Sequence, residues 1–238
     1  MNNQLPKTIL RSRYFLALLA GLMLAAAYPK MSLAGFAWIA PGLILFCGAG
    51  KTGRQQFWIG YCGGLGFFLA TLYWLLFIPF PGGAIAGWLA LSAYLSFYIG
   101  IWVWLCWRIF SKFISPAESL ESRGQASSFA ETFLQTTWKQ RAIWSLSCAV
   151  LWVAWEMTMA RLFSGLPWNF LGVTQYKIIP LIQIASFTGV YGISFLLAWF
   201  AVSLCCAGML LVRKPQPARA WSGEIILPAL TVAVIFSL

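Results

Sequence analysis

Histidine is absent from the 238-residue chain, and acidic side chains are scarce, with five Asp and Glu residues against sixteen Lys and Arg residues. Without histidine, neither a Ser-His nor a Cys-His catalytic pair can form. Charged residues make up 9% of the sequence, whereas a soluble domain carries about a quarter. A water-soluble enzyme, a disordered chain and a coiled coil are therefore excluded, and an integral membrane protein remains.

The net charge of +11 does not indicate nucleic-acid binding, because the basic residues form short clusters between apolar blocks, as membrane topology requires. No nucleic-acid partner is therefore expected. The six cysteines lie in apolar stretches without a C-x-x-C pair, which predicts buried thiols rather than metal ligands. No metal or other cofactor is expected. The cysteines are Cys47, Cys62, Cys106, Cys148, Cys205 and Cys206.

A membrane-spanning helix takes about 20 residues, and most of the apolar blocks reach this length, although the first is short. They predict an all-α integral membrane fold, a polytopic bundle of about seven transmembrane helices. The predicted spans are residues 14–28, 32–50, 57–78, 84–110, 142–160, 180–212 and 225–238.

The first and last spans each carry an additional expectation. Ala25-Ala26-Ala27 ends the first span, so a cleaved signal peptide is an alternative to a retained helix. The second span follows almost at once, which favours a helical hairpin. The last span stops at Leu238 without a polar flank, so we expect that it is truncated and that the chain is part of a longer protein.

The distribution of Lys and Arg predicts the orientation, because cytoplasmic segments are enriched in these residues. With the N-terminus in the cytoplasm and the C-terminus in the periplasm, thirteen of the sixteen lie on the inner side. The outer side holds Lys30, Arg161 and Lys177. Residues 111–141 then form a cytoplasmic loop, expected to be partly disordered, and residues 161–179 form a periplasmic loop.

An ionisable residue within a span is costly and indicates function by default. Glu156 is the one acidic residue clearly inside a span, near the outer end of the fifth, and Arg161 follows five positions later. Two interpretations remain open. Glu156 either forms a structural ion pair or a hydrogen bond to a loop, or it is a polar anchor at the mouth of a lipid-accessible cavity.

The periplasmic loop combines helix breakers with aromatic and amide side chains. Pro167, together with Gly165, prevents a continuous helix, and Trp168 suits the depth of lipid headgroups. Asn169 and Gln175 either satisfy the irregular backbone at membrane depth or bind a lipid headgroup. Both interpretations remain open.

Further candidates lie near the outer ends of other spans. Gln183 and Tyr191 add polarity to the sixth span, where Gly189 and Gly192 would let another helix approach. Tyr73 and Trp74 fall where an aromatic belt is expected even without a function. The patterns Gly60-x-x-x-Gly64 and Gly83-x-x-x-Gly87 predict close helix contacts.

Several of these patterns together resemble the signature of the bacterial apolipoprotein N-acyltransferase family. They are Trp152-x-x-x-Glu156, Gly165-Leu166-Pro167-Trp168, Gly172-x-x-Gln175 and the run of residues 180–196. Upstream, Gly60-x-x-x-Gly64, Tyr73-Trp74 and residues 93–98 are similar to the third and fourth spans of the family. The chain departs from the family at Met159, where an arginine is usual, and at Val173, where a tyrosine is usual.

The resemblance implies an acyltransferase of the bacterial inner membrane. Its membrane bundle admits lipids sideways, and a nitrilase-like domain, expected after Leu238, holds the cysteine nucleophile. That cysteine takes an acyl chain from a phospholipid donor as a thioester and passes it to the α-amine of a diacylglyceryl-cysteine on an apolipoprotein acceptor. None of the six cysteines here corresponds to that nucleophile, and Glu156 is not the base. We therefore expect no catalytic residue in this chain, which alone would be inactive.

The candidate substrate-binding residues are Glu156, Arg161, Pro167, Trp168, Asn169, Gln175, Gln183, Tyr191, Tyr73 and Trp74. Two other functions remain possible: a stand-alone, non-catalytic lipid-binding scaffold, and a small transporter component. The transporter is disfavoured, because the polar residues gather at the outer end of the spans rather than at the bilayer midplane. A fusion of the membrane half to a polyprenyl-phosphate mannosyltransferase is a weaker option.

Overall fold

The computed structural model describes residues 7–80, 82–114, 129–213 and 222–237, and every regular element in these ranges is helical. The predicted all-α class is therefore confirmed for them. The α-helices are α1 (Lys7–Ala26), α2 (Ala40–Cys47), α3 (Gly53–Thr71), α4 (Gly83–Ile109), α6 (Phe129–Gln135), α7 (Trp138–Met159), α8 (Ile179–Ile182), α9 (Ala185–Thr188), α10 (Val190–Arg213) and α11 (Ser222–Ser237). Short 3₁₀ turns are η1 (Ala34–Trp38), η2 (Tyr73–Phe77), η4 (Leu162–Ser164) and η5 (Leu171–Gln175), and a π turn, η3 (Phe110–Ile114), extends α4.

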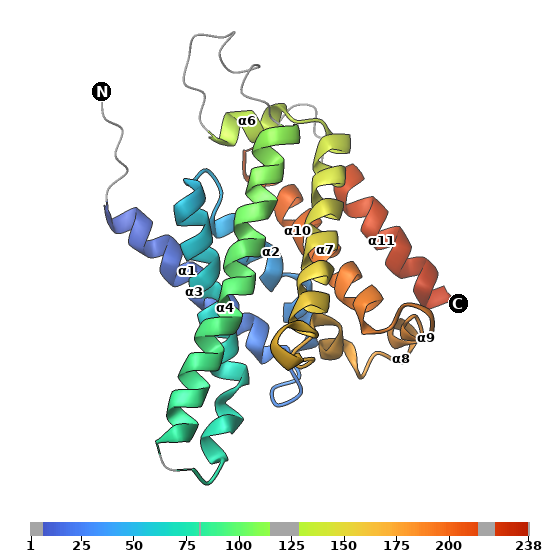
Figure 1. Cartoon of the computed structure of the whole chain (residues 1–238). Helices are drawn as coiled ribbons and strands as arrows, with labels where there is room; N and C mark the ends of the chain where they lie inside the picture. The colour runs from blue at the N-terminus through green and yellow to red at the C-terminus, as the bar shows by residue number, and fades with distance from the viewer. Residues whose placement is uncertain (1–6, 81, 115–128, 214–221, 238) are drawn as a thin grey trace.

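The long helices form a ring that the short helix α2 closes. Along the ring, α1 packs on α3, α3 on α4, α4 on α7 and α7 on α10. Helix α2 contacts both α10 and α1, and α11 lies outside the ring against α10 and α7. Figure 1 shows α2 at the centre, with α6 at one end of the bundle.

Three helices in the described part of the chain are long and apolar enough to cross a membrane: Gly83–Lys112, Trp138–Met159 and Val190–Val212. They correspond to the predicted fourth, fifth and sixth spans. Shorter apolar helices cover Ser12–Ala26, Ile179–Thr188 and Ile225–Phe236. The structure is thus that of a membrane-type helical protein, but it does not confirm seven complete spans.

The predicted second span, residues 32–50, is not one continuous helix in the structure. The chain turns after α1, where Ser32 has a positive φ of 56°, and forms η1 before α2 begins. Pro41 lies in the first turn of α2, because a residue without an N–H fits there and not in a helix interior. The eight residues of α2 reach about 12 Å, well short of the ~30 Å hydrocarbon core.

The sixth span, predicted as residues 180–212, is also broken. Gly189 has φ 64° and ψ −171°, which ends α9 and separates it from α10. The third span, residues 57–78, changes at its outer end from α3 into η2. A continuous apolar stretch predicted continuous helices, but glycine and tertiary contacts divide these segments into shorter pieces.

The cytoplasmic loop predicted at residues 111–141 is helical at both of its ends. Residues 115–128, on which the expected disorder partly falls, lie outside the described residues. Helix α6 follows, with Phe133 fully buried, and α7 already begins at Trp138. Phe133 packs on Trp144 and Phe110, so burial of aromatic side chains holds α6 against the ends of α4 and α7.

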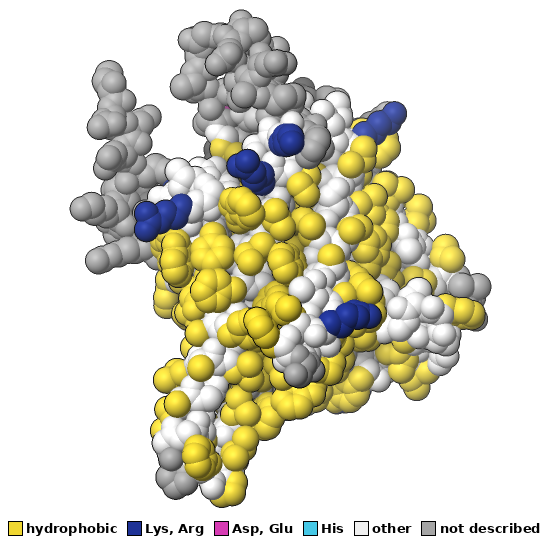
Figure 2. Space-filling model, in the orientation of Figure 1, with side chains coloured by type: hydrophobic (Ala, Val, Ile, Leu, Met, Phe, Trp, Pro, Cys, Tyr) yellow, Lys and Arg dark blue, Asp and Glu magenta, His cyan; other side chains and the backbone are white. Residues whose placement is uncertain are grey.

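Basic and apolar side chains occupy different zones of the surface. In Figure 2, most of the visible Lys and Arg side chains gather at the end where α6 lies, and hydrophobic side chains cover the face below them. Arg13 belongs to the basic end and donates hydrogen bonds to the carbonyls of Cys47 and Ala49, where α2 ends. A cation is favoured there by the helix dipole.

Glycines bring the backbones of neighbouring helices into contact. A Cβ on Gly66 would lie 2.4 Å from the Leu18 carbonyl oxygen, and one on Gly64 would lie 2.8 Å from the Ser96 Cα. The contact predicted from Gly60-x-x-x-Gly64 is therefore confirmed, between α3 and α4. The pattern at Gly83 and Gly87 does not form a close helix contact, because a Cβ on Gly87 would have no atom within 4 Å. Gly192 meets Thr188 of the adjacent α9 rather than a distant helix.

Substitution Gly66→Ala is expected to destabilise the bundle by about 1–3 kcal/mol, because a methyl group would force α1 and α3 apart. Gly87→Ala is the matched control, with no atom within 4 Å of the added methyl. Thermal unfolding of the purified chain in detergent measures both. Equal midpoints for the two variants would contradict the close α1–α3 contact.

Candidate functional site

Two irregular segments interlock at the end of the bundle opposite α6 (Figure 1). One joins α1 to α2 through η1, and the other joins α7 to α8 through η4 and η5. The second contains Gly165, whose φ of 76° favours glycine and whose Cα lies close to the Ala160 carbonyl. The irregular backbone predicted around Gly165 and Pro167 is therefore confirmed.

Glu156 fixes the second segment to α7. Its Oε1 accepts hydrogen bonds from the Trp152 indole (2.9 Å) and from the Leu171 amide (2.7 Å), and the side chain is 5% exposed. Leu171 is the first residue of η5, so the carboxylate meets unpaired amides at a helix start. The Ser194 hydroxyl accepts the Gly172 amide hydrogen and lies near the same carboxylate.

The structural ion pair between Glu156 and Arg161 does not form. Arg161 is exposed, and its guanidinium donates to the Met157 carbonyl (3.0 Å). Of the two structural interpretations of Glu156, the hydrogen bond to a loop is confirmed and the ion pair is wrong. The reason is that α7 ends at Met159, and the chain then turns the arginine back along its own helix.

Asn169 connects three separate parts of the chain. It adopts a left-handed φ of 60°, which asparagine tolerates better than most residues. Its side-chain amide nitrogen donates to the Thr71 hydroxyl (3.0 Å) at the end of α3, and its backbone carbonyl accepts the Tyr28 hydroxyl hydrogen (2.6 Å). Sequence patterns identified Asn169 but missed Thr71 and Tyr28.

Gln175 connects η5 to η1. It is fully buried, and its Oε1 accepts from the Trp38 indole (3.1 Å) while its Nε2 donates to the Ala34 carbonyl (3.1 Å) and to Thr174 Oγ1 (2.8 Å). These contacts match the proposal that Gln175 satisfies irregular backbone. They leave no exposed amide that could reach a headgroup.

A groove of about 600 Å³ lies between the outer ends of α1 and α3, and we call it the outer groove. Its volume is in the range of small-molecule sites, about 300–1,000 Å³. Aliphatic side chains dominate the part formed by α1, and polar and aromatic groups line the other part. The lining residues are Leu22, Met23, Ala25, Ala26, Tyr28, Pro29, Lys30, Met31, Ala70, Thr71, Tyr73, Trp74 and Asn169.

Aromatic side chains and one cation line the polar part of the outer groove. The Lys30 ammonium lies 4.0 Å from the centre of the Tyr73 ring, a distance at which cation–π attraction is significant. The Trp74 and Trp168 rings meet edge to face with centres 5.1 Å apart, and both indoles are partly exposed. The structure thus brings together three aromatic residues singled out in the sequence, and adds Lys30, whose only sequence signal was its outer position.

The Tyr176 hydroxyl connects the two segments at the surface. It lies 3.1 Å from the Ser32 hydroxyl. That hydrogen bond lowers the pKa of Tyr176 from its ordinary value, and the neighbouring Lys177 acts in the same direction.

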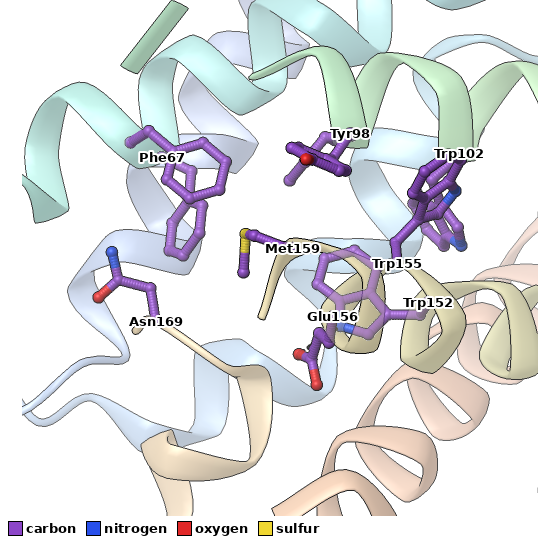
Figure 3. A pocket seen from close by; sticks show the side chains of 10 residues that line it. Phe67, Tyr98, Trp102, Trp152, Trp155, Glu156, Met159 and Asn169 are labelled. Carbon is purple, nitrogen blue, oxygen red and sulfur yellow. Dashed lines mark hydrogen bonds between the residues drawn. The ribbon is translucent and has the colours of Figure 1, made fainter. Parts of the chain in front are cut away.

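A second, smaller hollow of about 40 Å³ lies inside the ring, and we call it the aromatic cavity. In Figure 3, Phe67 and Tyr98 lie on one side, Glu156 on the other and Met159 between them. Asn169 lines both this cavity and the outer groove. The full lining is Phe67, Phe68, Tyr98, Ile99, Trp102, Trp152, Trp155, Glu156, Met159 and Asn169.

Like Arg161, Trp168 and Gln175, the three remaining sequence candidates line neither cavity. Gln183 is exposed between α8 and α9, and Pro167 is exposed in the second segment. Tyr191 packs its ring against Phe170, with centres 5.4 Å apart. None of the three lines the outer groove or the aromatic cavity.

Replacing Gln175 by leucine is expected to cost about 1–3 kcal/mol, because the Trp38 indole and the Ala34 carbonyl would lose their partner. Gln183→Leu changes the same atoms at an exposed position and is expected to be nearly neutral. Thermal unfolding of the purified variants gives both values. If Gln175→Leu were as stable as Gln183→Leu, the two segments would not depend on this bridge.

Comparison with known proteins supports the resemblance seen in the sequence. Residues 20–203 match the family model for the apolipoprotein N-acyltransferase N-terminal domain. The apolipoprotein N-acyltransferase of Geobacter metallireducens is 33% identical over 230 residues, which is 95% of this chain and 39% of that protein. The Coxiella burnetii protein of the same name is 27% identical over 78% of this chain and 34% of its own length. The Vibrio parahaemolyticus protein of the same name is 25% identical over 93% of this chain and 38% of its own length.

The chain therefore spans about two fifths of the length of these relatives. The family model covers most of the chain, including both irregular segments and the residues that line the two cavities. By this match and by its identity to the Geobacter protein, the chain belongs to the apolipoprotein N-acyltransferase family, in which it corresponds to the N-terminal domain.

Proposed function

We propose that this chain is the lipid-binding membrane part of an apolipoprotein N-acyltransferase. In this role it holds the phospholipid acyl donor and the diacylglyceryl-cysteine acceptor at the outer face of the bacterial inner membrane. The outer groove is the single observation that carries the proposal. Its aliphatic side, formed by α1, suits acyl chains, and its aromatic side, with Lys30 and Asn169, suits headgroups.

The irregular segments support an interfacial position for the groove. Backbone that is not helical is tolerated at membrane depth only where protein or water satisfies it. Here the Tyr28 hydroxyl donates to the Asn169 backbone carbonyl, and the Gln175 side-chain amide donates to the Ala34 backbone carbonyl. Trp74 and Trp168, partly exposed beside the groove, are typical of the headgroup layer.

We also propose that the end of the bundle with the groove faces the periplasm and that both the N-terminus and the α6 end face the cytoplasm. The gathering of Lys and Arg side chains at the α6 end supports this orientation. A reporter fused within the loop at Pro167 tests it. Activity of a periplasmic reporter supports the orientation, whereas activity of a cytosolic reporter contradicts it.

The transfer step itself belongs, in this proposal, to a nitrilase-like domain outside these 238 residues. The six cysteines are all free thiols in buried or half-buried positions, and the chain has no histidine to activate one of them. The chain would therefore bind lipids without forming the acyl thioester. A hydroxylamine-sensitive acyl-cysteine, formed when the purified chain is incubated with labelled phospholipid, would overturn this point.

Two substitutions in the full-length enzyme test the binding role. Trp168→Ala and Glu156→Gln are expected to lower acyl transfer by at least about tenfold while protein abundance falls less. The indole supports the groove wall, and the carboxylate holds the loop that carries this indole. Acyl transfer to a lipoprotein substrate, normalised to enzyme level in the membrane, is the measurement.

Trp58→Ala is the matched control, because Trp58 is also an exposed tryptophan, 42% against 46% for Trp168, but it packs on Phe57 and Tyr61 and not on a residue of the groove. It is expected to retain normal transfer. Equal losses of transfer and abundance in Trp168→Ala and Glu156→Gln would mean that these residues serve folding alone, and the binding role would fail.

A further inference from the structure

Four basic side chains gather around the start of α3, at the end of the bundle where α6 lies. Lys51 precedes α3 and Arg54 lies in its first turn, while Arg13 belongs to α1 and Arg108 to the last turn of α4. We call these four residues the basic cluster. Because α3 packs on both α1 and α4, the fold brings together cations that are far apart in the sequence.

Contacts between α1 and the start of α3 hold three members of the cluster close together. Burial lowers the pKa of Lys51, and the charge of the neighbouring Arg13 acts in the same direction. Arg54 lies within electrostatic range of Tyr14, the residue that follows Arg13 in α1. Arg13 uses only Nη1 for the two carbonyls at the end of α2, and a guanidinium carries five N–H donors, so it can still bind an anion.

Arg108 joins the cluster through a tryptophan of its own helix. Its guanidinium lies 5.8 Å from the centre of the Trp104 ring. The indole nitrogen of Trp104 in turn lies 3.1 Å from the position that a Cβ on Gly53, the first residue of α3, would occupy. The end of α4 and the start of α3 are therefore in contact at this point.

The basic cluster has no acidic partner within the part of the chain that the structure describes. Two glutamate side chains are described there, Glu131 on α6 and Glu156 at the opposite end of the bundle, and neither forms an ion pair with the cluster. The first turn of α3 holds no acidic residue either, although a helix start favours negative charge. Since like charges repel and destabilise a compact fold, an anion from outside the chain would be stabilised at this position.

An aromatic and then an aliphatic surface continues from the cluster toward the middle of the bundle. Phe57, Tyr61 and Leu65 follow Arg54 on α3 at spacings of three, seven and eleven residues, which places all four on one helix face. Phe97 of α4 is 45% exposed and meets both aromatic rings, with centres 5.8 Å from Phe57 and 5.1 Å from Tyr61. Cation, aromatic ring and aliphatic side chain follow one another over about 16 Å, the same order as headgroup, interface and acyl chain in a lipid.

We propose that the basic cluster binds the phosphate of an anionic phospholipid, whose acyl chains lie along this face of α3. In the proposed orientation the lipid belongs to the cytoplasmic leaflet. Basic pockets between membrane helices on this side hold lipids such as cardiolipin, so affinity should rise with the number of phosphates. The inference goes beyond the proposed function, because the site lies at the opposite end from the outer groove and its lipid is a resident component that undergoes no reaction.

A titration that varies the charge and the chains of the ligand tests the inference. The 238-residue chain in dodecyl maltoside receives phosphatidylglycerol, cardiolipin or phosphatidylcholine with identical acyl chains, or glycerophosphoglycerol, which is the headgroup without chains. Binding is followed as the shift of the thermal unfolding midpoint. Phosphatidylglycerol is expected to bind at least about tenfold more tightly than phosphatidylcholine, because each basic side chain contributes about 1 kcal/mol. Cardiolipin should bind more tightly still, and glycerophosphoglycerol should have no effect at the same concentration.

Variants locate the preference for anionic lipid at the cluster. The double variant Lys51→Gln with Arg54→Gln is expected to reduce that preference at least about fivefold. Lys139→Gln is the matched control, because Lys139 is an exposed cation at the same end of the bundle that contacts Trp138 and lies outside the cluster. It should leave the preference unchanged. If the double variant does not fold, Arg54→Gln alone decides, since Arg54 is exposed.

Three results would overturn the inference. Phosphatidylglycerol and phosphatidylcholine could bind equally, or Lys139→Gln could reduce the preference as much as the double variant does, which would mean that only the general charge of this end matters. Glycerophosphoglycerol could bind as tightly as phosphatidylglycerol, which would make the occupant a soluble phosphate. Each of these results leaves the proposed function standing, because acyl transfer and its dependence on Trp168 are measured at the other end of the bundle.

Discussion

The outer end of this bundle depends on the hydrogen bond between the Glu156 carboxylate and the Leu171 amide. Two stretches of the chain leave helical geometry where the surroundings are apolar, and their backbone groups need partners within the protein. Glu156 holds the second stretch to α7, and Gln175 and Asn169 join that stretch to the turn after α1 and to the end of α3. These contacts also fix the positions of Tyr28, Thr71 and Asn169, which line the groove.

The same contacts connect the two cavities. Asn169 lines both, and its position is fixed by Thr71 on one side and Tyr28 on the other. A lipid in the outer groove would thus lie against the residue that separates it from the aromatic cavity. This arrangement suits a substrate with an apolar body and a small polar end.

The sequence predicted the helical membrane class, the segment that carries the site and four residues that meet at the outer groove or beside it: Tyr73, Trp74, Trp168 and Asn169. The helix bounds that were predicted from apolarity alone did not match the structure. Residues 32–50 and 180–212 are as apolar as true spans, but Pro41 and Gly189 and the packing of α2 across the ring divide them. Hydropathy measures solubility in hydrocarbon and does not report where a backbone turns.

The partners of the site residues could not be predicted for a related reason. Tyr28 and Asn169 are separated by 141 positions, and so are Ala34 and Gln175, and no local pattern encodes such pairings.

The central claim is that lipid occupies the outer groove, and photo-crosslinking of the full-length enzyme in its membrane tests it most directly. With a phospholipid that carries a photoreactive acyl chain, the account predicts adducts concentrated on groove residues such as Leu22, Met31 and Ala70. Adducts spread evenly over the exposed faces of α4, α7 and α11 would contradict it.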